Sequence, residues 1–424
     1  MKKSFLLFTT LLLALSVILS ACAGANEGVG DNASNDVVQL KYWVPFSGGD
    51  GEYMQQMVDA FNESHEDVQV EMLNIKWEEY YTKLRTSLVS KTAPDIAVAH
   101  ASKLAELVPT GMVTDLSSLA EEAGVDWNTF SDNQLNATKL DGKHYAIPLD
   151  THALVMYYNK DYLNEAGLLD ENGQLKMDPS IDSFIDVLEE LKKTLPGDVF
   201  PFVSNTSSVY PFWIWYSLYS QMDDSGTYIV DGKASFDNEA AKKALQVMVD
   251  IQEKGLWPEN VTNGYDLFKS GKAAINFAGV WATGNYEKNE NLNFAAVPFP
   301  TLFDKPAAWG DSHTLIMPVQ DNKEKQVATA KFANWLAENG AMWAKAGHIP
   351  AKKDVLESEE YQSLKYRKDY AEAQSDVNYM PNHEKLWPVN DVIIKAFSEL
   401  LNGNVSVEET IEKVEKEVND VLEK

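Results

Sequence analysis

The spacing of apolar residues switches between two periods in the part of the chain that follows residue 37. Residues 38–44 and 68–72 place apolar side chains at every second position, which predicts two β-strands. Residues 54–61 and 77–88 repeat apolar side chains at helical spacing, which predicts two helices. A short apolar stretch at 94–98 begins with proline and predicts a third strand. The predicted order is therefore β-α-β-α-β.

This alternation indicates an α/β fold. Strands that are separated by helices pair in parallel through right-handed crossovers. Such sheets bind ligands beyond the carboxyl ends of their strands. The loops after Val44, Leu73 and Val98 are therefore candidate binding loops.

Two local signals place elements further along the chain. Asp141 and Gly142 predict a turn before a β-rich run at 146–158. Ser406 and Glu409 have the spacing of a capping box and predict the start of an amphipathic closing helix. We expect the apolar stripe of that helix to pack on the protein.

The composition of the chain disfavours several classes of partner and ligand. The 424 residues carry a formal net charge of −28, which disfavours nucleic acid as a partner. The length predicts two to three domains. Cys22 is the single cysteine, so no intramolecular disulfide forms. Arg85 and Arg367 are the only arginines, and this scarcity disfavours a carboxylate or phosphate ligand, which the guanidinium group binds well. We expect a neutral ligand.

The N-terminus has the pattern of a secretory signal. Lys2 and Lys3 precede a weakly polar to apolar run from Phe5 to Leu19, which is too short for a comfortable membrane span. The run ends in Leu-Ser-Ala-Cys, which resembles the lipobox of bacterial lipoproteins. That resemblance implies a signal peptide at 1–21 and a diacylated Cys22. Residues 23–36 are small and polar and predict a flexible tether.

Several short motifs occur in an order that resembles the family 1 extracellular solute-binding proteins of ATP-driven sugar importers, the group that includes maltodextrin-binding proteins. The motifs are Ala-Pro-Asp-Ile at 93–96, Asp-Gly-Lys-His-Tyr-Ala-Ile-Pro at 141–148, Tyr-Tyr-Asn-Lys-Asp at 157–161, Phe-Lys-Ser-Gly-Lys-Ala-Ala at 268–274, Gly-Val-Trp at 279–281, Val-Pro-Phe-Pro at 297–300 and the helix around 332–336. Each motif is weak alone, but their number and order are specific.

The resemblance implies a two-lobed periplasmic-binding-protein-like fold of type II. Each lobe would hold a mostly parallel sheet flanked by helices, with the ligand in the cleft between the lobes. The N-lobe would comprise 37–149 and 299–348, and the C-lobe 150–298 and 349–424. Three hinge crossings would lie near Leu149, Phe299 and Ile349.

The chemistry of a neutral oligosaccharide predicts the binding side chains. Sugar rings present apolar C–H faces and in-plane hydroxyls, so a site needs aromatic plates together with carboxylate, amide or imidazole groups. The aromatic candidates are Trp43, Trp77, Trp213, Trp281 and Trp387. Trp281 follows the Gly-x motif, where the family often stacks an aromatic ring under the sugar.

The polar candidates lie at strand ends and near the expected crossings. They are Asp50, His100, Ser102, Asp150, His152, Asp311, His313 and His383. Maltodextrin-binding proteins carry a glutamate where His152 stands, and an aromatic residue and an aspartate where Ala99 and Ser102 stand. These departures weigh against an α-glucan ligand and leave the sugar class unchanged.

We therefore expect a monomeric lipoprotein on the extracytoplasmic face of the bacterial cell membrane, held there by a lipid anchor on Cys22. It would bind an oligosaccharide and pass it by hinge closure to the permease subunits of an ABC importer, without enzymatic activity, cofactor or nucleic acid. The histidines show no His-x-x-x-His spacing. Asp170, Asn172 and Gln174 have the alternate spacing of the first half of a calcium-binding loop, but the glycine expected at its sixth position is absent, so no metal site is predicted. The alternatives are an extracellular glycoside hydrolase and a binding protein for a glycerophosphodiester.

Overall fold

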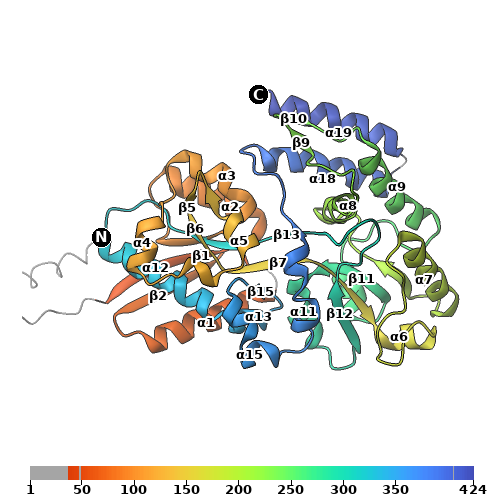
Figure 1. Ribbon diagram of the computed structural model, residues 1–424, viewed down its shortest axis with the longest axis horizontal. Coiled ribbons are helices and arrows are strands. Elements are labelled where there is room, and N and C mark those ends of the chain that lie inside the picture. The colour runs from red at the N-terminus through yellow and green to blue at the C-terminus, as the bar shows by residue number, and fades with distance from the viewer. Residues whose placement is uncertain (1–36, 47–48, 404) are drawn as a thin grey trace, which may run out of the picture. The chain divides into compact units, whose positions relative to one another are not determined.

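The computed structural model describes residues 37–46, 49–403 and 405–424. The signal peptide, Cys22 and the tether predicted for 1–36 lie outside the described residues. Within the described part, helices cover two separate sheets, which confirms the α/β class (Figure 1). No helix there is long and apolar enough to span a membrane.

The first sheet has the strand order β2-β1-β3-β14-β6. Its strands are β1 (Val38–Val44), β2 (Val68–Asn74), β3 (Ile96–His100), β6 (Ala146–Pro148) and β14 (His313–Ile316). The first three are parallel, as the sequence predicts, with helices α1 (Asp50–Ser64) and α2 (Trp77–Val89) as their connections. β14 runs antiparallel to both β3 and β6.

The pleat of β1 and β3 separates two cores. Leu40, Tyr42 and Val98 pack with α1 and with α12 (Lys323–Glu338), while Ala97 and Ala99 pack with α2 on the other face. Burial on both faces explains why β3 reads as a continuous apolar run.

The second sheet is built around β7 (Asp150–Asn159), all of whose residues are buried. The strand order is β16-β13-β7-β11-β8, and β12 and β15 also pair with β7. The partners are β8 (Phe200–Val203), β11 (Ala273–Gly279), β12 (Phe294–Pro298), β13 (Ala308–Asp311), β15 (Ile349–Pro350) and β16 (Val377–Asn378). Every strand that pairs with β7 is antiparallel to it.

The expectation of mostly parallel sheets is therefore wrong in detail, because both sheets are mixed. The chain passes from β6 to β7 through the single residue Leu149, so β7 continues in the direction of β6. β13 and β14 are likewise joined through Ser312 alone. β6 thus continues into β7, and β13 continues into β14, so that each pair passes from one sheet to the other. The two continuous segments run in opposite directions, which places antiparallel pairs in both sheets.

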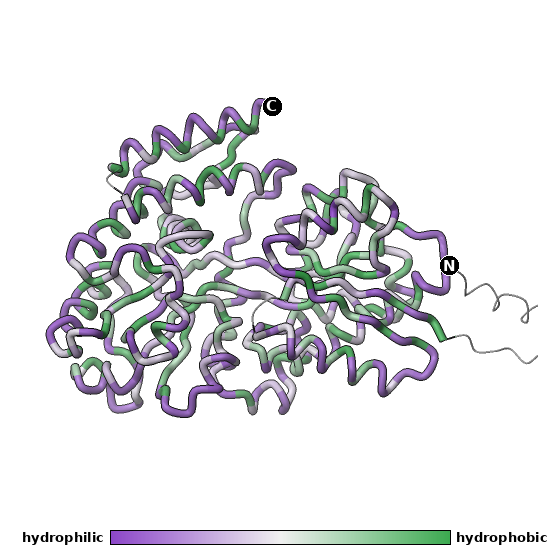
Figure 2. The backbone as a smooth tube through the Cα atoms, turned by 180° about the vertical axis from the view of Figure 1, so that it is seen from behind, coloured by the Kyte–Doolittle hydropathy of each residue, from purple (hydrophilic) through white to green (hydrophobic). Residues whose placement is uncertain are grey.

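Five long helices share a core with one face of the second sheet. They are α7 (Ile181–Thr194), α8 (Tyr210–Ser220), α9 (Glu239–Glu253), α18 (Leu386–Asn402) and α19 (Val407–Leu422). The predicted capping box of Ser406 and Glu409 is present, and Ile411, Val414 and Val418 of α19 are buried in the core that the helices share. The C-terminal pair α18 and α19 lies side by side in Figures 1 and 2, with polar positions of α19 facing outward.

Short elements complete the chain. The helices are α3 (Leu104–Leu107), α4 (Ser117–Glu122), α5 (Asp132–Ala137), α6 (Lys160–Glu165), α10 (Gly264–Lys269), α11 (Thr283–Glu287), α13 (Gly340–Ala344), α14 (Lys353–Glu357), α15 (Glu359–Gln362), α16 (Arg367–Tyr370) and α17 (Ala373–Asp376). The strands are β4 (Lys139–Leu140) with β5 (Lys143–His144), and β9 (Ile229–Val230) with β10 (Lys233–Ala234). The predicted turn at Asp141 and Gly142 joins β4 to β5 with positive φ at both residues.

One expected crossing lies elsewhere. The chain changes sheets at Leu149, as predicted, but it returns at Ser312 and not near Phe299. Gln221, at the end of α8, holds the intervening segment on the second sheet: its side-chain amide donates to the carbonyls of Pro300 (2.8 Å) and Ala307 (2.9 Å). β15, at the third expected crossing, pairs with Asp150 and Thr151 of β7.

Candidate functional site

A chamber of about 390 Å³ lies where the strand ends of the two sheets meet. This volume is within the range of small-molecule sites. It is lined by Pro45, Phe46, Asp50, Trp77, Glu78, His100, His152, Ser208, Val209, Tyr210, Trp213, Tyr265, Trp281, Trp309, Asp311, His313, His348 and Trp387. Among these described lining residues there is no lysine or arginine.

Three tryptophans form the wall on the side of the second sheet. Trp213 stacks on Trp309 with ring centroids 3.8 Å apart and planes 16° apart. Trp281 stands edge-on to both rings, at 5.8 and 6.4 Å. Its indole N–H donates to the hydroxyl of Tyr265 at 2.7 Å, which fixes the ring.

Gly279 permits the position of Trp281. A Cβ added at Gly279 would lie 2.1 Å from the indole ring, far closer than any van der Waals contact. The Gly-Val-Trp motif therefore works as a unit: β11 ends in glycine so that the tryptophan two residues later can fold back over it.

Trp77 and Trp387 close another side of the chamber. Their ring centroids are 6.2 Å apart, although Trp77 is the first residue of α2 on the first sheet and Trp387 is the second residue of α18 on the second sheet. The Lys103 ammonium lies 4.1 Å from the Trp387 centroid and 4.7 Å from that of Tyr81. It also pairs with Glu106 at 3.2 Å.

Lys103 gives a testable pH dependence. Burial lowers the pKa of Lys103 to about 8, although Glu106 acts in the opposite direction. In the unfolded chain the pKa of lysine is about 10.4, so between these values the unfolded state binds more protons and the free energy of unfolding rises with pH. The free energy of unfolding of the wild type, compared with that of Lys103→Met, is therefore expected to rise by about 2 kcal/mol between pH of about 7 and 10. Urea unfolding of both proteins at several pH values measures this, and a difference that stays constant with pH contradicts it.

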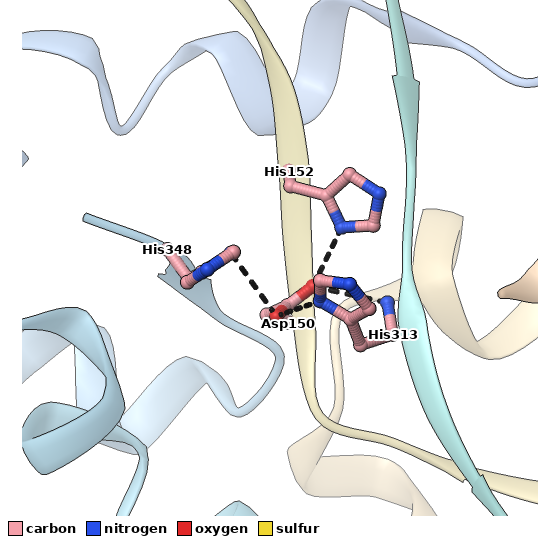
Figure 3. Close-up of side chains that lie close together, drawn as sticks. All are labelled: Asp150, His152, His313 and His348. Atoms are coloured by element: carbon pink, nitrogen blue, oxygen red, sulfur yellow. Dashed lines mark hydrogen bonds and ion pairs between the residues drawn. The ribbon is translucent and has the colours of Figure 1, made fainter. Parts of the chain in front are cut away.

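Four of the seven histidines gather beside the chamber. The ring centroids of His100 and His313 are 4.7 Å apart, those of His152 and His313 4.1 Å, and those of His313 and His348 5.2 Å. Asp150 is fully buried and lies between the rings of His152, His313 and His348 (Figure 3). Its carboxylate lies 3.1 Å from Nδ1 of His152, 2.8 Å from Nδ1 of His313 and 3.3 Å from Nδ1 of His348.

The surroundings set the charge of this cluster. Burial by itself raises the pKa of Asp150, but His313 and His348 outweigh it and hold the pKa well below its usual range. Burial and the neighbouring His313 lower the pKa of both His100 and His152. Asp150 is therefore held as a carboxylate, and the imidazoles of His100 and His152 favour the neutral form.

Asp311 is the second buried carboxylate. It accepts from the backbone N–H (3.3 Å) and hydroxyl (2.5 Å) of Ser102, and from the backbone N–H of Ser312 (2.8 Å). Burial raises its pKa. Because Ser102 follows β3 and Asp311 ends β13, this contact joins the two sheets beside the chamber.

The structure brings together most of the residues that the sequence proposed. Those that line the chamber are Asp50, Trp77, His100, His152, Trp213, Trp281, Asp311, His313 and Trp387. Asp150 and Ser102 lie behind them and hold lining side chains through hydrogen bonds. The predicted loop after β1 reaches the chamber through Phe46, and β3 reaches it through His100, its last residue.

Two further proposed residues, Trp43 and His383, neither line the chamber nor hold a lining side chain. Trp43 packs on the α2 side of the first sheet, under the Lys83 ammonium at 5.1 Å, because Tyr42 and Val44 take the opposite face of the strand. It lines a separate surface hollow with Glu78 and Thr82. His383 is half-buried in the turn before α18, where its Nδ1 accepts from the backbone N–H of Lys385 at 3.1 Å.

Sequence reasoning missed several lining residues. Phe46 lies two residues after the recognised strand β1, and Trp309 lies two residues from the proposed Asp311, so proximity to these features was an available signal. Tyr210 and Tyr265 lie in or beside short helices, and their hydroxyls contact each other. His348 directly precedes an expected crossing.

Comparisons with known proteins agree with this architecture. The family model described as "Bacterial extracellular solute-binding protein" matches residues 56–369. The arabinooligosaccharide-binding protein of Bacillus subtilis is 23% identical over 388 residues, covering 87% of this chain and 85% of the relative. The maltodextrin-binding protein MdxE of the same organism is 24% identical over 318 residues, covering 71% and 68%.

Solved structures share the fold at low sequence identity. The GacH receptor of Streptomyces glaucescens, known unliganded and with acarbose, aligns with a TM-score of 0.79 at 18% identity, covering 91% of this chain and 99% of that one. UgpB of Mycobacterium tuberculosis in complex with glycerophosphocholine aligns with a TM-score of 0.80 at 18% identity, covering 91% and 98%. The two-lobed binding-protein fold is thus confirmed. With a family match over most of its length, the chain belongs to the bacterial extracellular solute-binding proteins.

Proposed function

We propose that the protein captures a neutral oligosaccharide in the chamber and delivers it to an ABC importer, without chemical turnover. The observation that carries the proposal is the lining itself: indole rings on two sides, imidazoles and carboxylates between them, and no lysine or arginine among the described lining residues. Aromatic plates suit the C–H faces of sugar rings, and carboxylate and imidazole groups suit their hydroxyls. The names of the two Bacillus subtilis relatives are consistent with an oligosaccharide ligand.

The charge of the lining weighs against a phosphodiester. Asp50, Glu78 and Asp311 supply negative charge, and the two arginines pair elsewhere, Arg85 with Glu106 and Arg367 with Glu287. A phosphate would meet carboxylates without a bidentate cation to hold it. Glycerophosphocholine nevertheless belongs in the test, because aromatic faces attract its quaternary ammonium group.

Hinge closure is the proposed signal to the importer. A sugar that contacts both walls binds the closed arrangement better than the open one and shifts the population toward it. The residues that bend would lie near Leu149 and Ser312, where the chain passes between the sheets, and near Ile349, where β15 pairs with the start of β7.

The test is thermal unfolding of the purified protein against a panel of oligosaccharides, with glycerophosphocholine as the competing arm. A ligand at 100 times its Kd stabilises by about 2.7 kcal/mol, which a shift in Tm reports. Solution scattering with the stabilising sugar should show a smaller radius of gyration, and mass spectrometry should recover the sugar intact. Stabilisation by glycerophosphocholine alone, or shortened sugars in the mixture, would replace the proposal with the corresponding alternative.

Anchoring is tested separately at Cys22, which lies outside the described residues. Acylation needs the thiol and folding does not, so Cys22→Ser is expected to leave a folded protein that is lost from the membrane fraction. Two acyl chains anchor stably where one does not, so the loss should be nearly complete. Immunoblots of membrane and soluble fractions measure it. Retention at the wild-type level would contradict lipidation at this residue.

A further inference from the structure

A buried carboxylate surrounded by three imidazoles is the feature that sugar binding leaves unexplained. Asp150 and His152 belong to β7, His313 begins β14, and His348 directly precedes β15. One ligand atom from each of these four residues lies within 4.8 Å of the others. All four side chains are buried.

The carboxylate has more donors around it than it can accept. The indole N–H of Trp343 donates to Asp150 at 2.6 Å and the backbone N–H of His313 at 3.0 Å. His152, His313 and His348 also point Nδ1 at it, which makes five nitrogens around roughly four lone-pair positions. At least one imidazole is left over.

His348 is the imidazole left over. It is fully buried, and neither ring nitrogen has a hydrogen-bond partner among the described residues. If Nδ1 carries the proton, it lies 3.3 Å from Asp150 without hydrogen-bond geometry; if Nε2 carries it, the Nδ1 lone pair faces a carboxylate oxygen. Either neutral form leaves buried polar atoms unsatisfied, which is costly.

We infer that Asp150, His152, His313 and His348 form a binding site for a zinc-class divalent cation. A cation between the four groups takes the three Nδ1 lone pairs and one carboxylate oxygen, and it leaves Trp343 and the His313 backbone N–H as the donors to Asp150. Three imidazoles and a carboxylate are ligands that zinc accepts, and four protein ligands make a closed structural site.

The spacing suits the ion after a small contraction. Zinc lies about 2.0–2.2 Å from nitrogen and oxygen ligands, so neighbouring ligand atoms of a tetrahedral site stand about 3.4 Å apart. The separations of 2.8 to 3.3 Å from Asp150 are already close to this value. The ligand atoms lie within 4.8 Å of one another, so the widest pair must close by up to about 1.4 Å.

Neighbouring groups orient the ligands, as they do in established metal sites. Trp343 stacks on His348 with centroids 4.3 Å apart and planes 3° apart, which fixes that ring. Nε2 of His348 faces the Asp50 carboxylate at 3.8 Å, the partner expected for the N–H of a metal-bound imidazole. The cation would join β7, β14 and the start of β15, beside the chamber, independently of which solute binds there.

The test uses the purified protein, stripped with a chelator, passed over a desalting column and titrated with zinc chloride. We expect one zinc per chain by elemental analysis, a rise in Tm of roughly 5 °C, and visible absorption when cobalt replaces zinc. His348→Phe keeps the stack on Trp343 without ring nitrogens and should weaken zinc binding at least about 100-fold.

His144→Phe is the matched control. His144 stacks on Trp127 at 4.0 Å, as His348 stacks on Trp343, but it lies outside the cluster. This variant should bind one zinc with wild-type affinity. Circular dichroism checks that both variants are folded, and should His348→Phe fail to fold, His152→Gln takes its place. Less than one zinc per wild-type chain, or equal zinc binding by wild type and the cluster variants, would overturn the inference.

Discussion

Replacing Arg367 with methionine is expected to lower the free energy of unfolding by about 3–5 kcal/mol, the loss that follows when one partner of a buried ion pair is removed. The Arg367 side chain is 2% exposed and pairs with Glu287. It also donates to the carbonyls of Ala344 (2.9 Å), Lys345 (2.5 Å) and Lys365 (2.9 Å). Methionine fills a similar volume but satisfies none of these acceptors.

Arg85→Met provides the control. It removes the other arginine of the chain, which pairs with Glu106 at 2.7 Å while 52% of its side chain is exposed. Exposed pairs contribute about 0–1 kcal/mol, so this variant should unfold near the wild-type urea concentration. Urea unfolding followed by tryptophan fluorescence, with an unchanged m-value, measures both. Similar losses in the two variants would mean that the interactions of Arg367 do not hold the segment around α13.

Local pattern was sufficient for elements whose neighbours in sequence are also neighbours in space. β1, β2, β3 and the two helices between them follow apolar spacing directly, and the capping box of α19 is a contact over three residues. The direction of β7 and the return at Ser312 depend on contacts between distant segments, such as Gln221 with Pro300 and Ala307, which no local period records.

The same distinction divides the candidate site. Aromatic residues next to strand ends were found because a strand end is a local feature. Asp150, His152 and His313 were each proposed, but their assembly with His348 into one cluster was not, since these residues come from three segments that meet only in the folded chain. Trp43 was proposed for the site but does not line it, because neighbouring residues of a strand point to opposite faces of the sheet. Its side chain lies on the face that packs against α2.

Once the thermal screen has identified a stabilising sugar, Trp281→Ala is expected to weaken its binding by about 2 kcal/mol or more, which is roughly 30-fold in Kd. Trp281 is half-buried in the chamber wall and is held in place by Tyr265, so its ring is a preformed plate that costs little entropy to use. Isothermal titration calorimetry measures the change. Trp127→Ala is the control, because Trp127 is also half-buried and stacked, on His144, and does not line the chamber.

A second variant tests whether sugar binding depends on the fixed position of the Trp281 indole and not only on its presence. Gly279→Ala keeps the indole but places a Cβ 2.1 Å from it, so the ring must leave its bond to Tyr265 and its edge-on contacts with Trp213 and Trp309. If the plate acts through its fixed position, this variant should lose at least about 10-fold in affinity although no aromatic surface has been removed. Unchanged affinity in both variants would show that the sugar does not use this wall, and the stacking role would then pass to Trp77 and Trp387 across the chamber.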